Sequence, residues 1–380
     1  MTVEFVYVCT DMTGDNSTGL DSNNIATTHA SASFLDSGWM IAAAVNMDYA
    51  LICIGIIGTA ANALVLYALI VHNARETKKR MVNWLIINQN FIDLCCSFAI
   101  VVSLSIRVSN IYLTGAIGYI LCTIFINENA AMCLLNSTVI NLVTITVERY
   151  LKIVYPFWSK RNLKSWMIRA AIVFSWIAGI LSVAPLAVAT SFVREGTCQP
   201  LQLFWENAEI RDGYGVWNFV SFFLIPLIIF VYCYGHMVVV MRKQMRVMAG
   251  HNVEGSAQSA SQAQNKRIKW NIIKTMIIVS AFFIVCWFPL NVYMMVVGTM
   301  DTSELVIGSL ITLFLPYINI SLNPFIYSTK HEGVRRILAR MIVCRKHDDV
   351  AAVTGTAAGT GSNTGRAETK TTKNTGRCDK

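Results

Sequence analysis

Seven long apolar blocks constrain what this chain can fold into more than any other feature of its sequence. Each has about 20 mainly apolar residues, the length that a helix needs to cross the hydrocarbon core of a bilayer. The blocks cover residues 49–71, 83–106, 118–146, 167–190, 216–241, 271–298 and 305–328. The chain is 54% hydrophobic and 14% charged, whereas a soluble domain is about 45–50% apolar and about 25% charged. We therefore predict an all-α membrane protein, a seven-transmembrane helix bundle.

Other membrane architectures fit these blocks less well. Strands of a membrane barrel are shorter and alternate apolar with polar residues, and Met276–Val285 shows no such alternation. A transporter would need inverted repeats or a continuous polar path, and the sequence has no internal repeat. An intramembrane enzyme would need a nucleophile with its base, or a set of metal ligands, whereas His236 stands alone near the end of the fifth block. We therefore do not predict an enzyme.

The basic residues indicate the orientation in the membrane. Residues 1–48 contain six acidic residues and no Lys or Arg, which the positive-inside rule assigns to the outside. Seven spans counted from there leave only Arg107, Arg194 and Arg211, of 31 basic residues, in external loops. This predicts an extracellular N-terminal segment over 1–48 and a seven-helix bundle over 49–328. The net charge of +9 follows from this topology and requires no nucleic-acid partner.

Several residues outside the blocks or at their outer ends are candidates for covalent modification. Asn16 begins an N-x-S/T sequence in the external segment, which predicts glycosylation. Cys122 and Cys198 both lie on the external side, where a disulfide would tie the second external loop to the bundle. After the last block, 329–347 is predicted to form a short amphipathic eighth helix, with Cys344 placed for palmitoylation. Residues 348–380 are rich in Gly, Thr and Ala and are predicted to be disordered.

Polar side chains inside the blocks carry the functional information, because an ionisable group in a span costs several kcal/mol unless it faces protein or water. Asp93 lies near the middle of the second block. Four polar residues stand at comparable depths in other blocks: Asn62, Thr138, Asn319 and Asn323. One interpretation is a water-filled pocket that holds a small cation through oxygen ligands. The other is a set of interhelical hydrogen bonds that only stabilises the bundle.

Three motifs lie in the sixth and seventh blocks and directly after the third. They are Glu148-Arg149-Tyr150, Cys286-Trp287-Phe288-Pro289 and Asn323-Pro324-Phe325-Ile326-Tyr327. A proline inside a helix removes one backbone hydrogen bond and kinks the helix, which makes either a hinge or a passive bend. Arg149 either takes part in a switch or extends to the lipid headgroups.

Together these motifs resemble those of the rhodopsin-like (class A) G-protein-coupled receptors, over about residues 49–344. The features appear in the order of that family: Asn62, Asp93, Cys122, Glu148-Arg149-Tyr150, Trp176, Cys198, Pro226, Tyr234, Trp287 with Pro289, and Asn323-Pro324 with Tyr327. The resemblance implies a plasma-membrane receptor that catalyses nothing, binds an extracellular ligand and activates a heterotrimeric G protein by opening an intracellular cavity. It also implies arrestin as a partner of the tail once its hydroxyls are phosphorylated.

The resemblance also implies roles for single residues. It implies an allosteric sodium pocket, and no other cofactor, formed by Asp93, Thr138, Asn319 and Asn323. Trp287 would sense the ligand. Arg149, Tyr234 and Tyr327 would rearrange to open the G-protein cavity, and Glu148 would neutralise Arg149 in the resting state.

The third block departs from the family pattern, because Cys122 lies two residues farther from Arg149 than is usual. We therefore expect a bulge or a shifted helix start near Asn127–Asn129. Glu128, which lies there, is predicted either to bind a ligand ammonium or a basic peptide side chain, or to cap loop groups at the water interface.

The sequence narrows the chemical class of the ligand only in part. The last block contains no Lys to bind retinal and has Tyr317 at that depth, which excludes a photopigment. Ala131 stands where monoamine receptors have an Asp. The predicted ligand pocket consists of Glu128, Ala131, Trp287 and Tyr317. The sixth and seventh blocks resemble peptide receptors near the somatostatin and galanin groups, so a neuropeptide is favoured, and an amine-like or melatonin-like molecule is the alternative.

Overall fold

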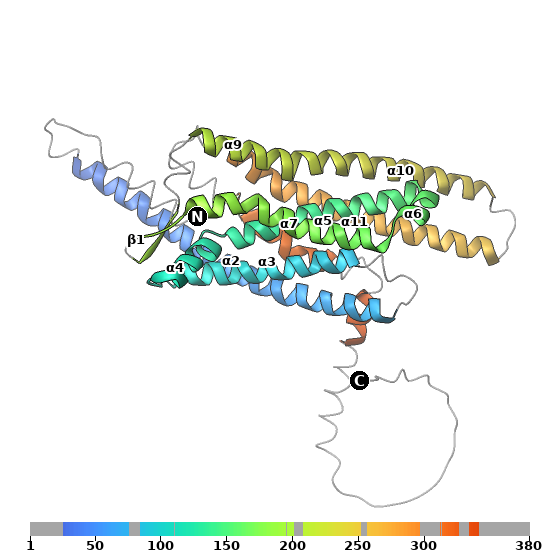
Figure 1. The fold of residues 1–380 in the computed structure, drawn as a ribbon, viewed down its shortest axis with the longest axis horizontal. Helices are drawn as coiled ribbons and strands as arrows, with labels where there is room; N and C mark the ends of the chain where they lie inside the picture. The colour runs from blue at the N-terminus through green and yellow to red at the C-terminus, as the bar shows by residue number, and fades with distance from the viewer. Residues whose placement is uncertain are drawn as a thin grey trace, which may run out of the picture.

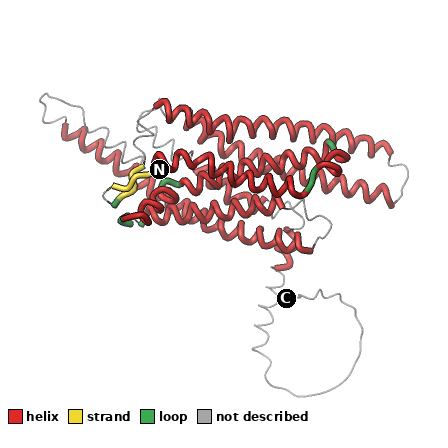
Figure 2. Tube along the Cα trace, in the orientation of Figure 1, coloured by secondary structure: helices red, strands yellow, loops and turns green. Residues whose placement is uncertain are grey.

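The computed structural model describes residues 26–75, 84–109, 111–194, 196–200, 208–251, 257–296, 312, 314–326 and 334–341. Long helices lie side by side along one axis (Figures 1 and 2). The α-helices are α2 (Ala26–Arg75), α3 (Trp84–Val108), α4 (Gly115–Leu121), α5 (Asn129–Val154), α6 (Pro156–Asn162), α7 (Ser165–Thr190), α9 (Ala208–Phe219), α10 (Ile225–His251) and α11 (Ala257–Val296). Residues 314–326 and 334–341 are also helical.

Six helical stretches within the described residues are long and apolar enough to cross a membrane. They are Val45–Ala74, Trp84–Val108, Asn129–Val154, Ser165–Pro185, Gly213–Val247 and Ile273–Tyr293. Each agrees with one of the first six predicted blocks. The described part of the seventh block is the helix over 314–326. Large apolar side chains such as Phe98, Leu181 and Val231 are exposed on these helices, as expected for surfaces that face lipid.

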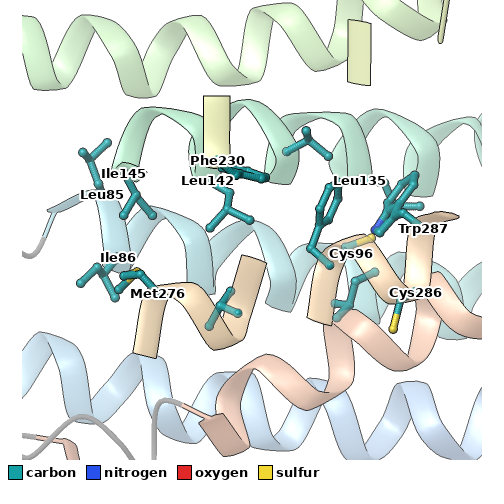
Figure 3. Close-up of a cluster of buried hydrophobic side chains, with 14 of the residues drawn as sticks. Leu85, Ile86, Cys96, Leu135, Leu142, Ile145, Phe230, Met276, Cys286 and Trp287 are labelled. Carbon is teal, nitrogen blue, oxygen red and sulfur yellow. The ribbon is translucent and has the colours of Figure 1, made fainter. Parts of the chain in front are cut away.

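The helices pack around one extended core. α3 contacts α2 and α5, α5 contacts α7 and α10, and α10 contacts α11. Figure 3 shows part of this core, where side chains from α3, α5, α10 and α11 meet. The closest approach of α5 and α7 depends on Gly179, because a Cβ there would overlap the side chain of Ser137 and the carbonyl oxygen of Cys133.

One end of the bundle carries a β-hairpin, which the sequence analysis did not predict. Strand β1 (Ser191–Arg194) pairs antiparallel with β2 (Thr197–Pro200). Gly196 has φ +79°, a left-handed conformation that favours glycine, and its carbonyl oxygen accepts a 2.7 Å hydrogen bond from the Leu113 N–H. We call this end the hairpin end, at the left of Figure 1, and the opposite end the α6 end.

The predicted third block is interrupted near its start. After α4 the chain forms a π-helical turn, η1 (Cys122–Ile126), and α5 begins only at Asn129. Glu128, between them, has φ 56°. Its N–H donates to the Phe125 carbonyl at 2.8 Å, and the Asn127 N–H donates to the Cys122 carbonyl at 3.0 Å. The expected irregularity near Asn127–Asn129 is therefore present, and a wide turn with one left-handed residue absorbs the additional length.

Several helices extend beyond the predicted apolar blocks, and α2, α10 and α11 extend farthest. α2 begins at Ala26 instead of residue 49, α10 continues to His251, and α11 begins at Ala257 instead of residue 271. Hydropathy identifies the part of a helix that is apolar enough to lie in a bilayer, and it does not show where the whole helix begins and ends. The polar first turns of α11 are rich in Ala, Gln and Lys, which favour helix without any apolar signal.

A short amphipathic helix follows the bundle over 334–341. Val334 and Ile337 are buried, whereas Arg335 and Arg340 are exposed. The rest of the predicted range 329–347 lies outside the described residues, as do Asn16, Cys344 and the tail over 348–380.

Candidate functional site

Asp93 is the centre of a buried polar site in the middle of the bundle, where its side chain is inaccessible to solvent. One carboxylate oxygen, Oδ1, accepts hydrogen bonds from Gln89 Nε2 and Thr138 Oγ1, both at 3.1 Å. The other, Oδ2, accepts from Asn323 Nδ2 at 3.0 Å. The carboxylate thus joins α3 to α5 and to the helix over 314–326, and it brings together three of the four residues predicted for the sodium pocket.

The fourth predicted residue, Asn319, is buried but has no direct hydrogen bond to Asp93. The side-chain oxygens of Asn319, Asn323 and Asn62 are buried without a hydrogen-bond partner in the described part of the chain. Carboxylate and amide oxygens are the ligands that hard cations prefer. A carboxylate beside unpartnered amide oxygens is therefore a donor set that fits a small cation.

A polar chain that the sequence analysis missed extends from Asp93 across the bundle. Gln89 Oε1 accepts from Asn141 Nδ2 at 2.7 Å, and Asn141 Oδ1 accepts from Asn88 Nδ2 at 2.9 Å. Asn88 Oδ1 in turn accepts from Trp176 Nε1 of α7 at 3.0 Å. The polar run before Asp93 was visible in the sequence, but which of its members face α5 is fixed only by the helix rotation.

Glu148, Arg149 and Tyr150 lie close to the last turn of α5, at the α6 end. Arg149 is only 9% exposed, so its side chain is buried in protein and does not extend to the headgroups. Its Nε lies 3.3 Å from Glu148 Oε2, and Glu148 also forms an ion pair with Lys152. Glu148 and Arg149 thus form an ion pair, and the role of this pair in the resting state stays a prediction.

Two tyrosines connect this motif to α10. Tyr234 shares a 2.8 Å hydrogen bond with Thr146 and a 3.1 Å hydrogen bond with Ser280 of α11, and it interacts electrostatically with Arg149. Tyr150 shares a 3.1 Å hydrogen bond with His236. Tyr234 therefore contacts α5 at Thr146, three residues before Arg149, while Tyr327, the third predicted member of this group, lies outside the described residues.

Trp287 lies in α11 two residues before Pro289 and is buried. A series of aromatic rings leads from it toward the α6 end. The ring of Trp287 lies 5.5 Å from that of Phe283, which lies 6.1 Å from that of Phe230, which lies 6.2 Å from that of Tyr234. Close packing through these rings can carry a displacement of Trp287 to Tyr234.

The predicted ligand residues meet at the hairpin end. Glu128 is 7% exposed, and its carboxylate accepts hydrogen bonds from Arg107 of α3 and from Tyr317. Ala131, which follows Glu128 by three residues in α5, is fully buried. Glu128 makes no side-chain cap to α5, and its carboxylate bonds the side chains of Arg107 and Tyr317. Arg107 was missed as a site residue, although it is one of the few basic residues predicted on the external side.

The prediction that Cys122 and Cys198 form a disulfide is confirmed. Their Cα atoms lie 5.4 Å apart, and both residues are buried. The disulfide joins β2 to the first residue of η1, six residues before Glu128 in the chain. It therefore fixes the hairpin against the bundle near the candidate ligand residues.

A bundle of long apolar helices with a buried polar centre and an ion-paired arginine at one end is the arrangement of a multi-pass membrane protein. Residues 61–327 match the model of the 7 transmembrane receptor (rhodopsin family), which is more than half of the chain. The chain therefore belongs to the rhodopsin-like (class A) G-protein-coupled receptors, a family of receptors and not of enzymes. The predicted seven-span fold and the predicted family are confirmed.

Several receptors for peptides are distant relatives. The mouse (Mus musculus) substance-K receptor is 24% identical over 74% of this chain and 68% of its own length. The neuropeptide FF receptor 1 of Rattus norvegicus is 26% identical over 53% of this chain and 49% of its own length. The somatostatin receptor type 1 of Rattus norvegicus is 23% identical over 83% of this chain and 76% of its own length.

The fold is similar to that of squid rhodopsin. Its crystal structure aligns with 78% of this chain and 84% of the squid chain, with a TM-score of 0.63 and 18% sequence identity. At this identity the likeness supports the fold alone.

Proposed function

We propose that this receptor binds an extracellular neuropeptide at the hairpin end and activates a heterotrimeric G protein at the α6 end. The observation that carries the proposal is the series of rings from Trp287 to Tyr234, which ends beside Arg149. A ligand that moves Trp287 would change the packing around Arg149. The ligand has only to bind the open state better by a few kcal/mol to shift the population.

The proposed orientation puts the hairpin end outside the cell, with the protein in the plasma membrane. Two observations support it. The disulfide requires an oxidising compartment. The α6 end carries exposed basic side chains such as Lys160, Arg161, Arg242 and Lys243, as the positive-inside rule requires of a cytoplasmic face. This orientation puts the segment over 1–48 outside the cell and the tail over 348–380 inside it, with the bundle over 49–328 between them.

A peptide is the favoured ligand because the relatives named above are described as receptors for peptides. An amine-like or melatonin-like molecule is the second candidate, and the buried Glu128 carboxylate favours the amine. Screening both classes with a G-protein dissociation readout across the main alpha-subunit families decides between them. If the receptor promotes no guanine nucleotide exchange, either with a ligand of these classes or without one, the proposal is contradicted.

Sodium is proposed as an allosteric ligand of Asp93, Thr138, Asn319 and Asn323. A bound cation would compensate the buried carboxylate and hold the inactive packing of α3 and α5. We expect sodium chloride to raise the thermal unfolding temperature of the purified receptor relative to N-methylglucamine chloride, and Asp93→Asn to remove this difference. Asn136→Ala is the matched control, because Asn136 bonds Ser182 at 2.9 Å, in a separate pair. Equal sodium responses in the wild type and in Asp93→Asn would refute the sodium pocket.

Phe157 is proposed as a G-protein contact. Its side chain is 90% exposed in α6, and its chain neighbours Tyr155 and Trp158 are exposed as well, beside basic residues. Exposed apolar side chains that gather and are rimmed by polar residues mark an interaction surface. Phe157→Ala should slow receptor-catalysed nucleotide exchange about tenfold, the loss expected from a modest interface hot spot. Trp166→Ala controls for the general loss of an exposed aromatic at this end. If both variants slow exchange equally, Phe157 has no specific role.

The remaining proposals concern residues outside the described part of the chain. Asn16 is proposed to carry a glycan and Cys344 a palmitoyl group. Phosphorylated threonines of the tail are proposed to recruit arrestin. Each follows from the proposed orientation.

A further inference from the structure

Gln89 of α3 connects the Asp93 carboxylate to the polar chain behind it. The Gln89 Nε2 donates to Asp93 Oδ1 at 3.1 Å, and its Oε1 accepts from Asn141 Nδ2 of α5 at 2.7 Å. All three side chains are buried. Thr138 Oγ1 also donates to Asp93 Oδ1, at 3.1 Å. Two donors of the protein itself therefore occupy the two lone pairs of this carboxylate oxygen.

The orientation of the Gln89 amide is fixed by its partners. An amide can present either its oxygen or its NH₂ group, so the groups around it decide which one it presents. The polar chain ends on the Trp176 indole, which can only donate, so Asn88 accepts with its Oδ1 and donates with its Nδ2. Asn141 accepts that bond on its Oδ1, and its Nδ2 donates to the Leu85 carbonyl at 3.1 Å and to Gln89. Gln89 thus turns its oxygen to Asn141 and an N–H to the carboxylate.

The other two donors to Asp93 keep an oxygen for a cation. A hydroxyl that donates its hydrogen retains lone pairs, so Thr138 can donate to the carboxylate and still contact a cation. Asn323 donates through Nδ2, and its Oδ1 is buried with no hydrogen-bond partner in the described part of the chain. The oxygen of Gln89 is instead turned toward Asn141. Of these three donors, Gln89 is therefore the one that bonds the carboxylate and offers no ligand to a cation.

We propose that Gln89 is an internal competitor of the cation for Asp93, and that Asn141 holds it in that role. The inference rests on the proposed sodium site and names the residues that set the affinity of that site. A cation competes with the Gln89 N–H for the carboxylate, whereas a Gln89 amide released from Asn141 can turn its oxygen to the same cation. Hydrogen bonds to a charged group are stronger than neutral ones, so the loss of this donor changes cation binding measurably.

Sodium titrations of the purified full-length receptor test this role. The measured quantity is the sodium concentration that gives half of the maximal rise in thermal unfolding temperature, with N-methylglucamine chloride keeping the ionic strength constant. Gln89→Met keeps the length of the side chain and removes the donor. We expect it to lower the half-maximal sodium concentration about tenfold, because one hydrogen bond to a charged group no longer competes. Gln89→Leu, which also lacks the donor, replaces it if Gln89→Met does not fold.

Asn141→Ala tests whether Asn141 holds Gln89 in place. It frees the Gln89 oxygen, so it should lower the half-maximal sodium concentration by about threefold or more. In the Gln89→Met background it should have no further effect, because no amide is left to turn. Asn136→Ala is the matched control, since it also removes a buried amide of α5, one that bonds Ser182 at 2.9 Å in a separate pair. It should leave the concentration within about twofold of the wild type.

A merely structural role of these hydrogen bonds gives a different result. The variants would then unfold at a lower temperature without sodium, and the half-maximal sodium concentration would not fall. That result, or an equal effect of Asn141→Ala in both backgrounds, overturns the role of Gln89 and leaves the sodium site standing.

The sodium site itself is tested by the same titrations. A response in Gln89→Met but not in the wild type supports the competition and rejects sodium regulation of the wild type. The lack of a response in every variant rejects both the sodium site and its internal competitor. Guanine nucleotide exchange is measured on the same samples with added G protein, and its absence throughout rejects the proposed receptor function without changing what the sodium concentrations show.

Discussion

Arg149→Ala is expected to abolish G-protein activation while the amount of receptor at the cell surface stays at the wild-type level. Arg149 is buried at the α6 end, paired with Glu148 and in electrostatic contact with Tyr234. Losing a buried charged contact of this kind costs about 2 kcal/mol or more, which corresponds to at least about a 30-fold loss of exchange rate. Nucleotide exchange in reconstituted receptor, together with surface labelling of intact cells, measures both quantities.

Lys152→Ala is the matched control, because Lys152 pairs with the same Glu148 but is more exposed. It should leave exchange within about twofold of the wild type, as expected for a partly exposed ion pair. Arg149→Ala receptor that still reaches the surface and still activates the G protein would remove Arg149 from the proposed switch.

Removing the disulfide with Cys198→Ala is expected to be the most destabilising single change outside the core. The cross-link joins residues 76 positions apart, and closing a loop of that length restricts the unfolded chain by about 4 kcal/mol in the chain-entropy description. We expect a lower thermal unfolding temperature in detergent and less receptor at the surface. Cys53→Ala changes an exposed cysteine of α2 that forms no disulfide and serves as the control.

Reduction of the wild-type receptor should reproduce the loss seen with Cys198→Ala and add nothing further to that variant. An unfolding temperature unchanged by Cys198→Ala would mean that β1 and β2 are held by the Leu113–Gly196 hydrogen bond and packing alone.

The sequence predicted the spans and the family well, because both depend on properties that are local in the chain. Apolar length identifies a span, and motifs such as Glu148-Arg149-Tyr150 identify a family. The spacing of Cys122 and Arg149, compared with the family pattern, also predicted the irregularity before Asn129. The β-hairpin was missed because its strands are four residues each and have no strong alternation.

Contacts between helices were harder to predict. The sequence indicated that Asp93, Thr138 and Asn323 lie at one depth. The hydrogen bonds that connect Gln89 and Asn141 to them depend on how α3 and α5 are rotated about their axes, which the sequence does not report. The Arg107–Glu128 ion pair was hard to predict for a similar reason, because the sequence placed Arg107 in a solvent-exposed external loop. Its burial depends on where α3 ends relative to the break before α5, which hydropathy does not report.

The break at Glu128 separates the start of the third predicted span from α5. An α-helix rotates each residue by about 100°, so a two-residue offset left inside a straight helix would turn its side chains by about 200°. The wide turn before Asn129 takes up this offset outside α5, which then continues without interruption to Val154 and carries Arg149. A change in this turn can therefore alter which side chains face the hairpin end and leave the direction of Arg149 at the α6 end unchanged.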